Sequence, residues 1–153
     1  MENLIILNNK KVKRILKTLE EQFGYDNKLN EFAFFYKKKD SSIKIITRDV
    51  DKIINEKLNI DSLGLRIGKE ISDGILLTIE GSQILGPYCD KNIVELNEKE
   101  SREWLRGYDV QRDEMKSGFA LLKHNKDFLG TGKVKKGCII NNISKSRRIK
   151  SKD

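Results

Sequence analysis

Short apolar runs separated by glycines fill the C-terminal part of the sequence, and they restrict the fold more than any other feature. The pattern predicts a strand at residues 92–96, followed by a helix that Asn97 caps and whose early turns carry three glutamates. Carboxylates there suit the positive end of a helix dipole. Four more short strands are predicted at residues 108–111, 118–124, 128–134 and 138–143. Such a series is typical of a small closed β-barrel.

An amphipathic helix is predicted near the N-terminus. Between residues 10 and 23, apolar side chains recur at i, i+3, i+4, i+7 and i+11, which places them on one helical face. Asn8 and Asn9 are suitable N-caps, and Gly24 is placed to end the helix in a left-handed turn. The basic residues of the opposite face are expected to be solvated rather than bound to RNA.

Two aromatic or β-branched runs, residues 31–37 and 43–48, are separated by a polar segment that suits a hairpin. An aromatic strand beside lysines can serve as a base-stacking platform. Four consecutive large residues nevertheless favour a strand that is buried on at least one face. Further elements are expected as a helix at residues 49–58, strands at 63–67 and 75–79, and a helical turn at 82–85.

The single proline of the chain, in Gly86-Pro87, marks the predicted domain boundary. We therefore expect an α+β chain with an N-terminal α/β lobe at residues 1–86 and a small β-barrel at residues 87–153. A chain of 153 residues is long enough to build a core without disulfides or metals. Cys89 and Cys138 are expected to be free thiols.

Positive charge is concentrated at the end of the chain. Residues 1–129 contain 23 Lys and Arg against 22 Asp and Glu, whereas residues 130–152 contain eight Lys and Arg and no acid. Because phosphate contacts release condensed counterions, such a cluster indicates a protein that binds a polyanion. A solvated basic tail is the alternative interpretation.

Residue patterns for catalysis are missing from the sequence. His124 is the single histidine, so neither a serine triad nor a zinc site has enough candidate residues, and we expect His124 to be structural or solvated. The segment at residues 130–133 resembles part of a phosphate loop, but Asp127 and Val134 stand where that motif requires a glycine and a hydroxyl. We expect the chain not to be an enzyme and to need no cofactor or metal.

The first residues contain an apolar run of only four residues after an acidic one, which is too short for a signal peptide. No stretch approaches the length of a membrane span. The expected location is therefore the cytoplasm.

Several segments of the C-terminal part follow the order and spacing of a known RNA-binding domain. They are Trp104-Leu105-Arg106-Gly107, the apolar run at 117–123, Leu129-Gly130-Thr131-Gly132-Lys133, and residues 141–149. This series resembles the PUA-like domain attached to rRNA cytosine methyltransferases of the NOL/NOP/Sun (Fmu) family. There the pattern is Trp-x-Arg-Gly, an apolar strand, Leu-Gly-x-Gly-Lys and Asn-x-x-Pro-Lys-x-x-Arg. Ser144 stands at the place of that proline, so the last turn is expected to differ in shape.

The layout of the whole chain is similar to that of stand-alone archaeal PUA-domain proteins of ribosome biogenesis, with an N-terminal lobe of the pre-PUA type. The resemblance is specific only from about residue 81 onward. It implies binding to structured rRNA or tRNA in ribosome biogenesis or RNA modification. The methyltransferases carry a separate domain for S-adenosylmethionine and a nucleophilic cysteine after a proline. This chain has no room for that domain and Cys89 follows Tyr88, so we expect binding without catalysis.

The predicted RNA-binding residues come from the basic cluster and from the resemblance. Gly130 and Gly132 allow close approach of an RNA backbone to the chain. Lys133 and Lys135 share one face of a strand, and Lys136 lies opposite. Asn141 either reads base edges or forms a turn, and Trp104 is expected to be a core anchor. The predicted set is Arg106, Tyr108, Lys133, Lys135, Lys136, Asn141, Lys145, Arg147 and Arg148.

Two other functions fit the same sequence. The basic end suits an interaction adaptor that docks onto an acidic partner during pre-ribosome assembly. The chain also suits an accessory subunit of an RNA methyltransferase. The expected partners are therefore structured RNA and, in addition, ribosome-assembly proteins or a methyltransferase, with no membrane.

Overall fold

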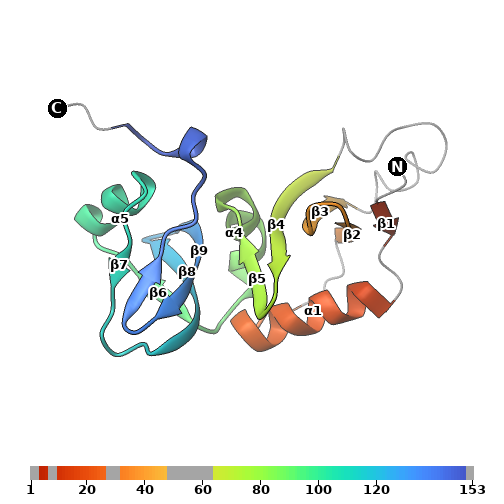
Figure 1. The fold of residues 1–153 in the computed structure, drawn as a ribbon, viewed down its shortest axis with the longest axis horizontal. Coiled ribbons are helices and arrows are strands. Elements are labelled where there is room, and N and C mark those ends of the chain that lie inside the picture. The colour runs from red at the N-terminus through yellow and green to blue at the C-terminus, as the bar shows by residue number, and fades with distance from the viewer. Residues whose placement is uncertain (1–3, 7–9, 27–31, 48–63, 151–153) are drawn as a thin grey trace.

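The computed structural model describes residues 4–6, 10–26, 32–47 and 64–150. It contains two five-stranded sheets, one formed by strands β1 to β5 and the other by β6 to β10. Helix α1 lies against the first sheet, α4 lies between the two sheets, and α5 lies at the far end of the second sheet (Figure 1). The predicted α+β class is therefore confirmed.

The first sheet is an antiparallel meander in the order β1-β2-β3-β4-β5. Each strand pairs with the next one along the chain, so short connections are sufficient. The N-terminal elements are β1 (Leu4–Ile6), α1 (Lys10–Phe23), β2 (Phe32–Lys37), β3 (Ser42–Thr47), β4 (Leu65–Ile71), β5 (Gly74–Leu77), α4 (Ile79–Leu85) and the 3-10 turn η1 (Gly86–Tyr88).

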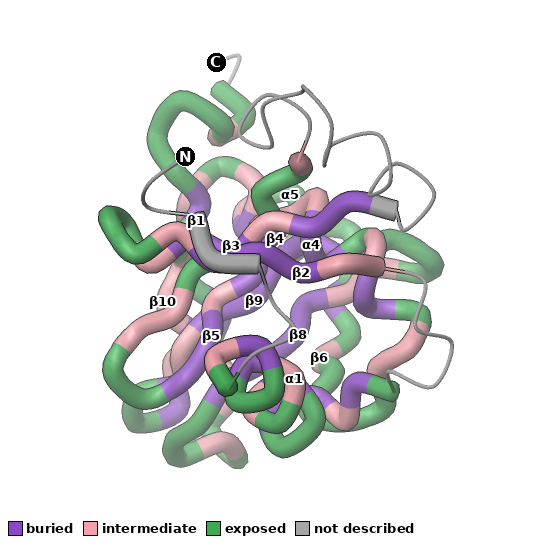
Figure 2. The backbone as a smooth tube through the Cα atoms, turned by 90° about the vertical axis from the view of Figure 1, so that its right-hand side faces the viewer, coloured by how far each residue is buried: buried purple, intermediate pink, exposed green. Residues whose placement is uncertain are grey.

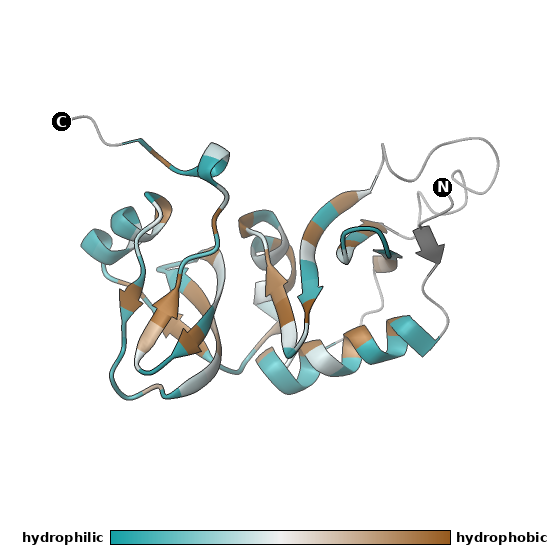
Figure 3. Ribbon diagram, in the orientation of Figure 1, coloured by the Kyte–Doolittle hydropathy of each residue, from teal (hydrophilic) through white to brown (hydrophobic). Residues whose placement is uncertain are grey.

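Helix α1 has the predicted bounds, and its apolar face is buried in the core of the first sheet. Hydropathy alternates along α1 accordingly (Figure 3). Gly24 ends the helix with a φ of 66°, as expected for a left-handed turn.

On the other face of α1, Lys11 and Arg14 bind Glu70 on β4. Burial raises the pKa of Glu70, but the hydrogen bonds and charges of Lys11 and Arg14 outweigh this effect and lower it. The predicted caps Asn8 and Asn9 and the predicted helix at 49–58 lie outside the described residues.

The aromatic run on β2 belongs to the protein core. Phe34, Phe35 and Tyr36 are buried, with at most 7% of their surface exposed. The hairpin of β2 and β3 is present in full register, with Phe32 opposite Thr47. The buried interpretation of this strand is therefore correct, and the run is not a base-stacking platform.

The second sheet is a curled half-barrel with the order β6-β8-β9-β10-β7. Its strands β6 and β7 form the two edges, and no pairing joins them among the described residues. The expected full closure is not found, because the edge strands are only three and two residues long. The C-terminal elements are β6 (Ile93–Glu95), α5 (Glu98–Leu105), β7 (Val110–Gln111), β8 (Ser117–His124), β9 (Asp127–Lys135), β10 (Cys138–Ile140) and the 3-10 turn η2 (Lys145–Arg147).

Helix α5 closes the core of the half-barrel with Trp104. This indole is fully buried, and its Nε1 donates a hydrogen bond to the carbonyl of Leu129 at 2.7 Å. Asn97 and Glu100 form a capping box that fixes the start of the helix. The prediction that Trp104 anchors the core is confirmed.

The two sheets share one of the two apolar cores. Phe119, Leu121 and Phe128, from β8 and β9, belong to the buried cluster of the first sheet. Buried stretches of β5, β8 and β9 lie at the centre of the molecule (Figure 2). The hydroxyl of Thr131 also accepts a hydrogen bond from the amide of Leu77 at 2.8 Å.

Packing continues across the predicted boundary at Gly86-Pro87. Gly86 is buried, and a Cβ placed on it would lie 2.6 Å from the ring of Phe128. The chain passes from one sheet to the other here, through a connection whose residues 90–92 are exposed. The division into residues 1–86 and 87–153 therefore stays a prediction.

Candidate nucleic-acid interface

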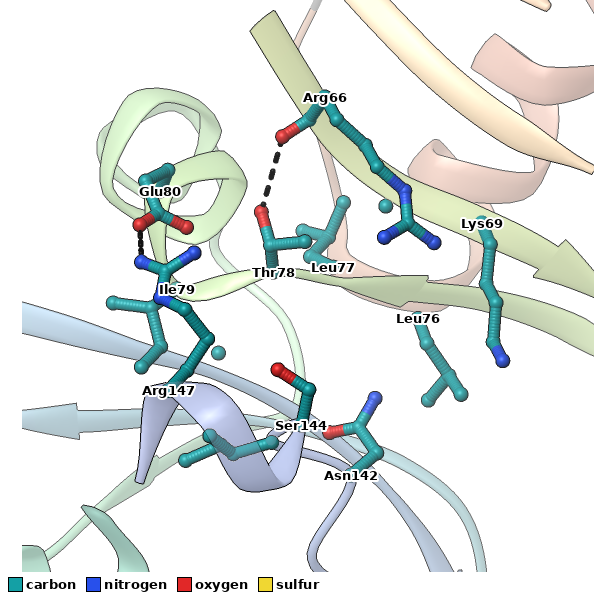
Figure 4. A pocket seen from close by; sticks show the side chains of 13 residues that line it. Arg66, Lys69, Leu76, Leu77, Thr78, Ile79, Glu80, Asn142, Ser144 and Arg147 are labelled. Carbon is teal, nitrogen blue, oxygen red and sulfur yellow. Dashed lines mark hydrogen bonds and ion pairs between the residues drawn. The ribbon is translucent and has the colours of Figure 1, made fainter. Parts of the chain in front are cut away.

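A cavity of about 220 Å³ lies where the two sheets meet. We call it the junction pocket. Strands β4 and β5 and the start of α4 line it on one side, and Gly130 of β9 and the segment after β10 line it on the other. Figure 4 shows Arg66 and Lys69 projecting from β4, and Arg147 turned toward Glu80. The polar residues that line the junction pocket are Arg66, Lys69, Thr78, Glu80, Asn142, Ser144 and Arg147.

A β-bulge brings two cations of β4 to the same cavity. Gly68 pairs with Ile43 and Arg66 pairs with Lys44, so Ile67 has no partner on β3. In a regular strand, Arg66 and Lys69 would point to opposite faces, because they are three residues apart. The extra residue changes this alternation, and both side chains line the pocket.

The segment after β10 is held in place by Asn141. Its backbone amide donates to Asp109, and its side-chain amide donates to the carbonyls of Trp104 and Tyr108 at 2.7 and 3.0 Å. Its side-chain oxygen accepts from the amide of Ile143 at 2.8 Å. Of the two roles considered for Asn141, the structure shows the turn-forming one.

Arg148 fixes the same segment against the end of α5. Its Nε donates to the carbonyl of Ile143 at 2.9 Å, and its side chain passes over Gly107. Gly107 has a φ of 105°, and a Cβ on it would lie 2.6 Å from the Arg148 side chain. The glycine of the Trp-x-Arg-Gly motif therefore makes room for the arginine at the end of the last motif. The side chain of Arg148 is half-buried and stabilises the fold, whereas Lys145 and Arg147 are exposed on η2.

The lysines of β9 lie toward the other end of that strand. Lys133 forms an ion pair with Asp73, on the turn between β4 and β5, at 2.5 Å. The hydrogen bond from Lys133 lowers the pKa of Asp73, and the charge of Lys135 acts in the same direction. Both lysines lie on β9 two residues apart, so they share a face, as predicted. Lys136 has a φ of 49° in the turn that leads to β10. Lys133 connects the two sheets, so its charge is already partly neutralised.

Arg106 and Tyr108 lie in a third place, at the connection from α5 to β7. Both are exposed, and 63% of Tyr108 is accessible to solvent. Of the nine predicted residues, the structure brings Arg147 alone to the junction pocket. Sequence reasoning missed Arg66, Lys69 and Thr78, which are distant in sequence from the basic cluster.

The candidate catalytic groups, His124, Cys89 and Cys138, are all half-buried. His124 forms a hydrogen bond through Nδ1 with the carbonyl of Leu96 at 2.8 Å. Both cysteines are free thiols, as expected, and burial raises the pKa of Cys89 to about 12. Among the described residues, no three His, Cys, Asp or Glu side chains gather as a metal site would require. Within the same ranges, no helix has the length and apolar character needed to cross a membrane.

A comparison with protein families agrees with the architecture of the second sheet. This sheet is a curled half-barrel that α5 caps and that a basic segment follows. Residues 91–149 match the family model of the PUA domain of methyltransferase RsmF. No curated protein matches the chain. The C-terminal part is therefore a PUA-like domain related to those of rRNA methyltransferases, and such domains have a general role in RNA binding.

Proposed function

We propose that the protein binds rRNA or tRNA in the cytoplasm and acts in ribosome biogenesis or RNA modification without catalytic activity of its own. The observation that carries this proposal is the junction pocket. There the basic segment of the PUA-like domain meets the cations that the bulge on β4 presents. Cations from both sheets converge on one cavity, as expected for a site that holds a sugar-phosphate chain.

A binding role without catalysis is supported by the state of the reactive side chains. The thiol of Cys89 has a raised pKa because it is buried, which disfavours the nucleophilic thiolate. The single histidine is held by a backbone carbonyl. The proposed relation to stand-alone archaeal PUA-domain proteins of the NOL/NOP/Sun (Fmu) family rests on the sequence motifs and on the order of the two sheets.

We name four exposed side chains the junction cations: Arg66, Lys69 and Arg147, which line the junction pocket, and Lys145, which does not line it but begins the same turn η2 as Arg147. Reversing three of them, in the variant Arg66→Glu, Lys145→Glu and Arg147→Glu, should weaken RNA binding by at least about 100-fold at 0.15 M salt. Each reversal removes a phosphate contact and adds a repulsion. Fluorescence anisotropy with a labelled structured RNA measures the change.

The matched control replaces Lys10, Lys13 and Lys17 with glutamate. These three lysines are exposed on α1, and their reversal changes the net charge by the same amount. It should lose much less affinity. Equal losses in the two variants would mean that only net charge matters and would reject the site. A pulldown before and after ribonuclease treatment tests the alternative role as an adaptor, because an adaptor keeps its partners when the RNA is digested.

A further inference from the structure

We infer that the junction pocket receives one unpaired nucleotide of the bound RNA, and that its phosphate replaces Glu80 as the partner of Arg147. This inference rests on the proposed RNA-binding function and adds the form of RNA that the site selects. Three features of the pocket support it: its size, the chemistry of its walls, and the ion pair at its rim.

The size of the cavity suits a single nucleotide. Its volume of about 220 Å³ is below the ~300–1,000 Å³ typical of pockets for drug-sized ligands. A double helix is too wide to enter, so paired RNA can only lie across the opening. A base that is unpaired and turned out of its stack is the part of an RNA that such a cavity can enclose.

The walls of the cavity match the parts of a nucleotide. Leu76 and Ile79, which are half-buried, supply apolar surface for the face of a base, and the buried side chains of Leu77 and Ile143 complete the apolar lining. Among the described residues, the exposed guanidinium of Arg66 forms no hydrogen bond or ion pair and acts on Asp40 only through its charge. This planar group can therefore stack on a base or bind phosphate. Thr78, Asn142 and Ser144 place hydroxyl and amide groups at the same cavity.

The ion pair of Arg147 and Glu80 lies at the rim of this cavity (Figure 4). The side chain of Arg147 is 53% exposed and that of Glu80 is 34% exposed, so solvent reaches both partners. Exposed pairs of this kind are weak. A phosphate forms a bidentate pair with arginine as readily as a carboxylate does. Glu80 therefore competes with RNA for Arg147 and lowers the affinity of the site for phosphate.

Two RNA probes separate the pocket from general electrostatic binding. One is a blunt duplex, and the other is the same duplex with one bulged nucleotide, prepared with each of the four bases in turn. The wild-type protein should bind the bulged duplex about tenfold more tightly, as expected for one stacked base. Arg66→Lys keeps the charge but lacks the planar group, so it should lower the ratio of bulged-duplex to blunt-duplex affinity from about ten toward one.

Glu80→Gln should tighten binding of the bulged duplex by about threefold to fivefold, because the competing carboxylate is gone. The control Glu20→Gln makes the same chemical change at an exposed position of α1. It should raise the affinity for both RNAs equally and only slightly. Circular dichroism verifies that each variant is folded.

The outcomes of these experiments separate failure of the nucleotide pocket from failure of the proposed RNA-binding function. Binding of both probes with equal affinity by the wild type would overturn the nucleotide pocket and leave RNA binding in place. A preference for the bulge that Arg66→Lys and Glu80→Gln do not change would place the nucleotide elsewhere and overturn the assignment. Absence of binding to either probe would reject the proposed function itself.

Discussion

Replacing Trp104 with alanine should lower the free energy of unfolding by about 3–5 kcal/mol, the usual cost of removing a large buried aromatic side chain. The indole is fully buried in the core of the half-barrel. Its removal leaves a cavity and also leaves the carbonyl of Leu129 without its partner. Because domains are stable by only about 5–15 kcal/mol, this loss is a large fraction of the total stability.

Chemical denaturation followed by far-ultraviolet circular dichroism measures this loss, because the variant has no tryptophan to report by fluorescence. Trp104→Phe is the matched control, since it keeps an aromatic ring and removes the hydrogen bond. It should lose clearly less stability than the alanine variant. An unchanged denaturation midpoint for Trp104→Ala would contradict the assignment of this residue to the core.

Replacing Phe128 with alanine should also cost about 3–5 kcal/mol, and it should destabilise both sheets together. Phe128 extends from β9 into the core of the first sheet and packs on Gly86. If that core is shared, unfolding is a single cooperative transition. Trp104 fluorescence, which reports on the second sheet, should then follow the same denaturation curve as circular dichroism, which reports on both sheets.

Phe128→Leu is the control, because it preserves most of the apolar volume. It should shift the midpoint by a smaller amount and keep the two curves coincident. Separate transitions in the wild type would show instead that residues 1–86 and 87–153 fold as independent domains. In that case, the predicted boundary would hold despite the contacts across it.

Local patterns predicted the elements of the fold well where a single face or a cap determines the structure. Helix α1 has its predicted bounds, because its apolar spacing and Gly24 both act locally. Helix α4 begins at Ile79, earlier than expected, because the side chain of Thr78 caps it. The shared core was not predicted. It depends on Phe119 and Phe128 meeting the first sheet, and strand alternation alone does not identify a partner across the chain.

The candidate site was predicted less well, because charge alone does not show which cations remain available. Arg147 reaches the junction pocket, but Arg148 and Asn141 hold the turn that positions it. Lys133 is paired with Asp73. Arg66 and Lys69 reach the pocket through a bulge that depends on the pairing of β3 and β4, and no local signal in the sequence indicates it.

The salt dependence of RNA binding tests the central claim most directly. If the four junction cations each neutralise one phosphate, the logarithm of the association constant should fall against the logarithm of the salt concentration with a slope of about −3. The triple charge reversal leaves only Lys69 of the four, so the slope should become no steeper than about −1. A wild-type affinity that does not change with salt would contradict the claim that these side chains hold an RNA backbone.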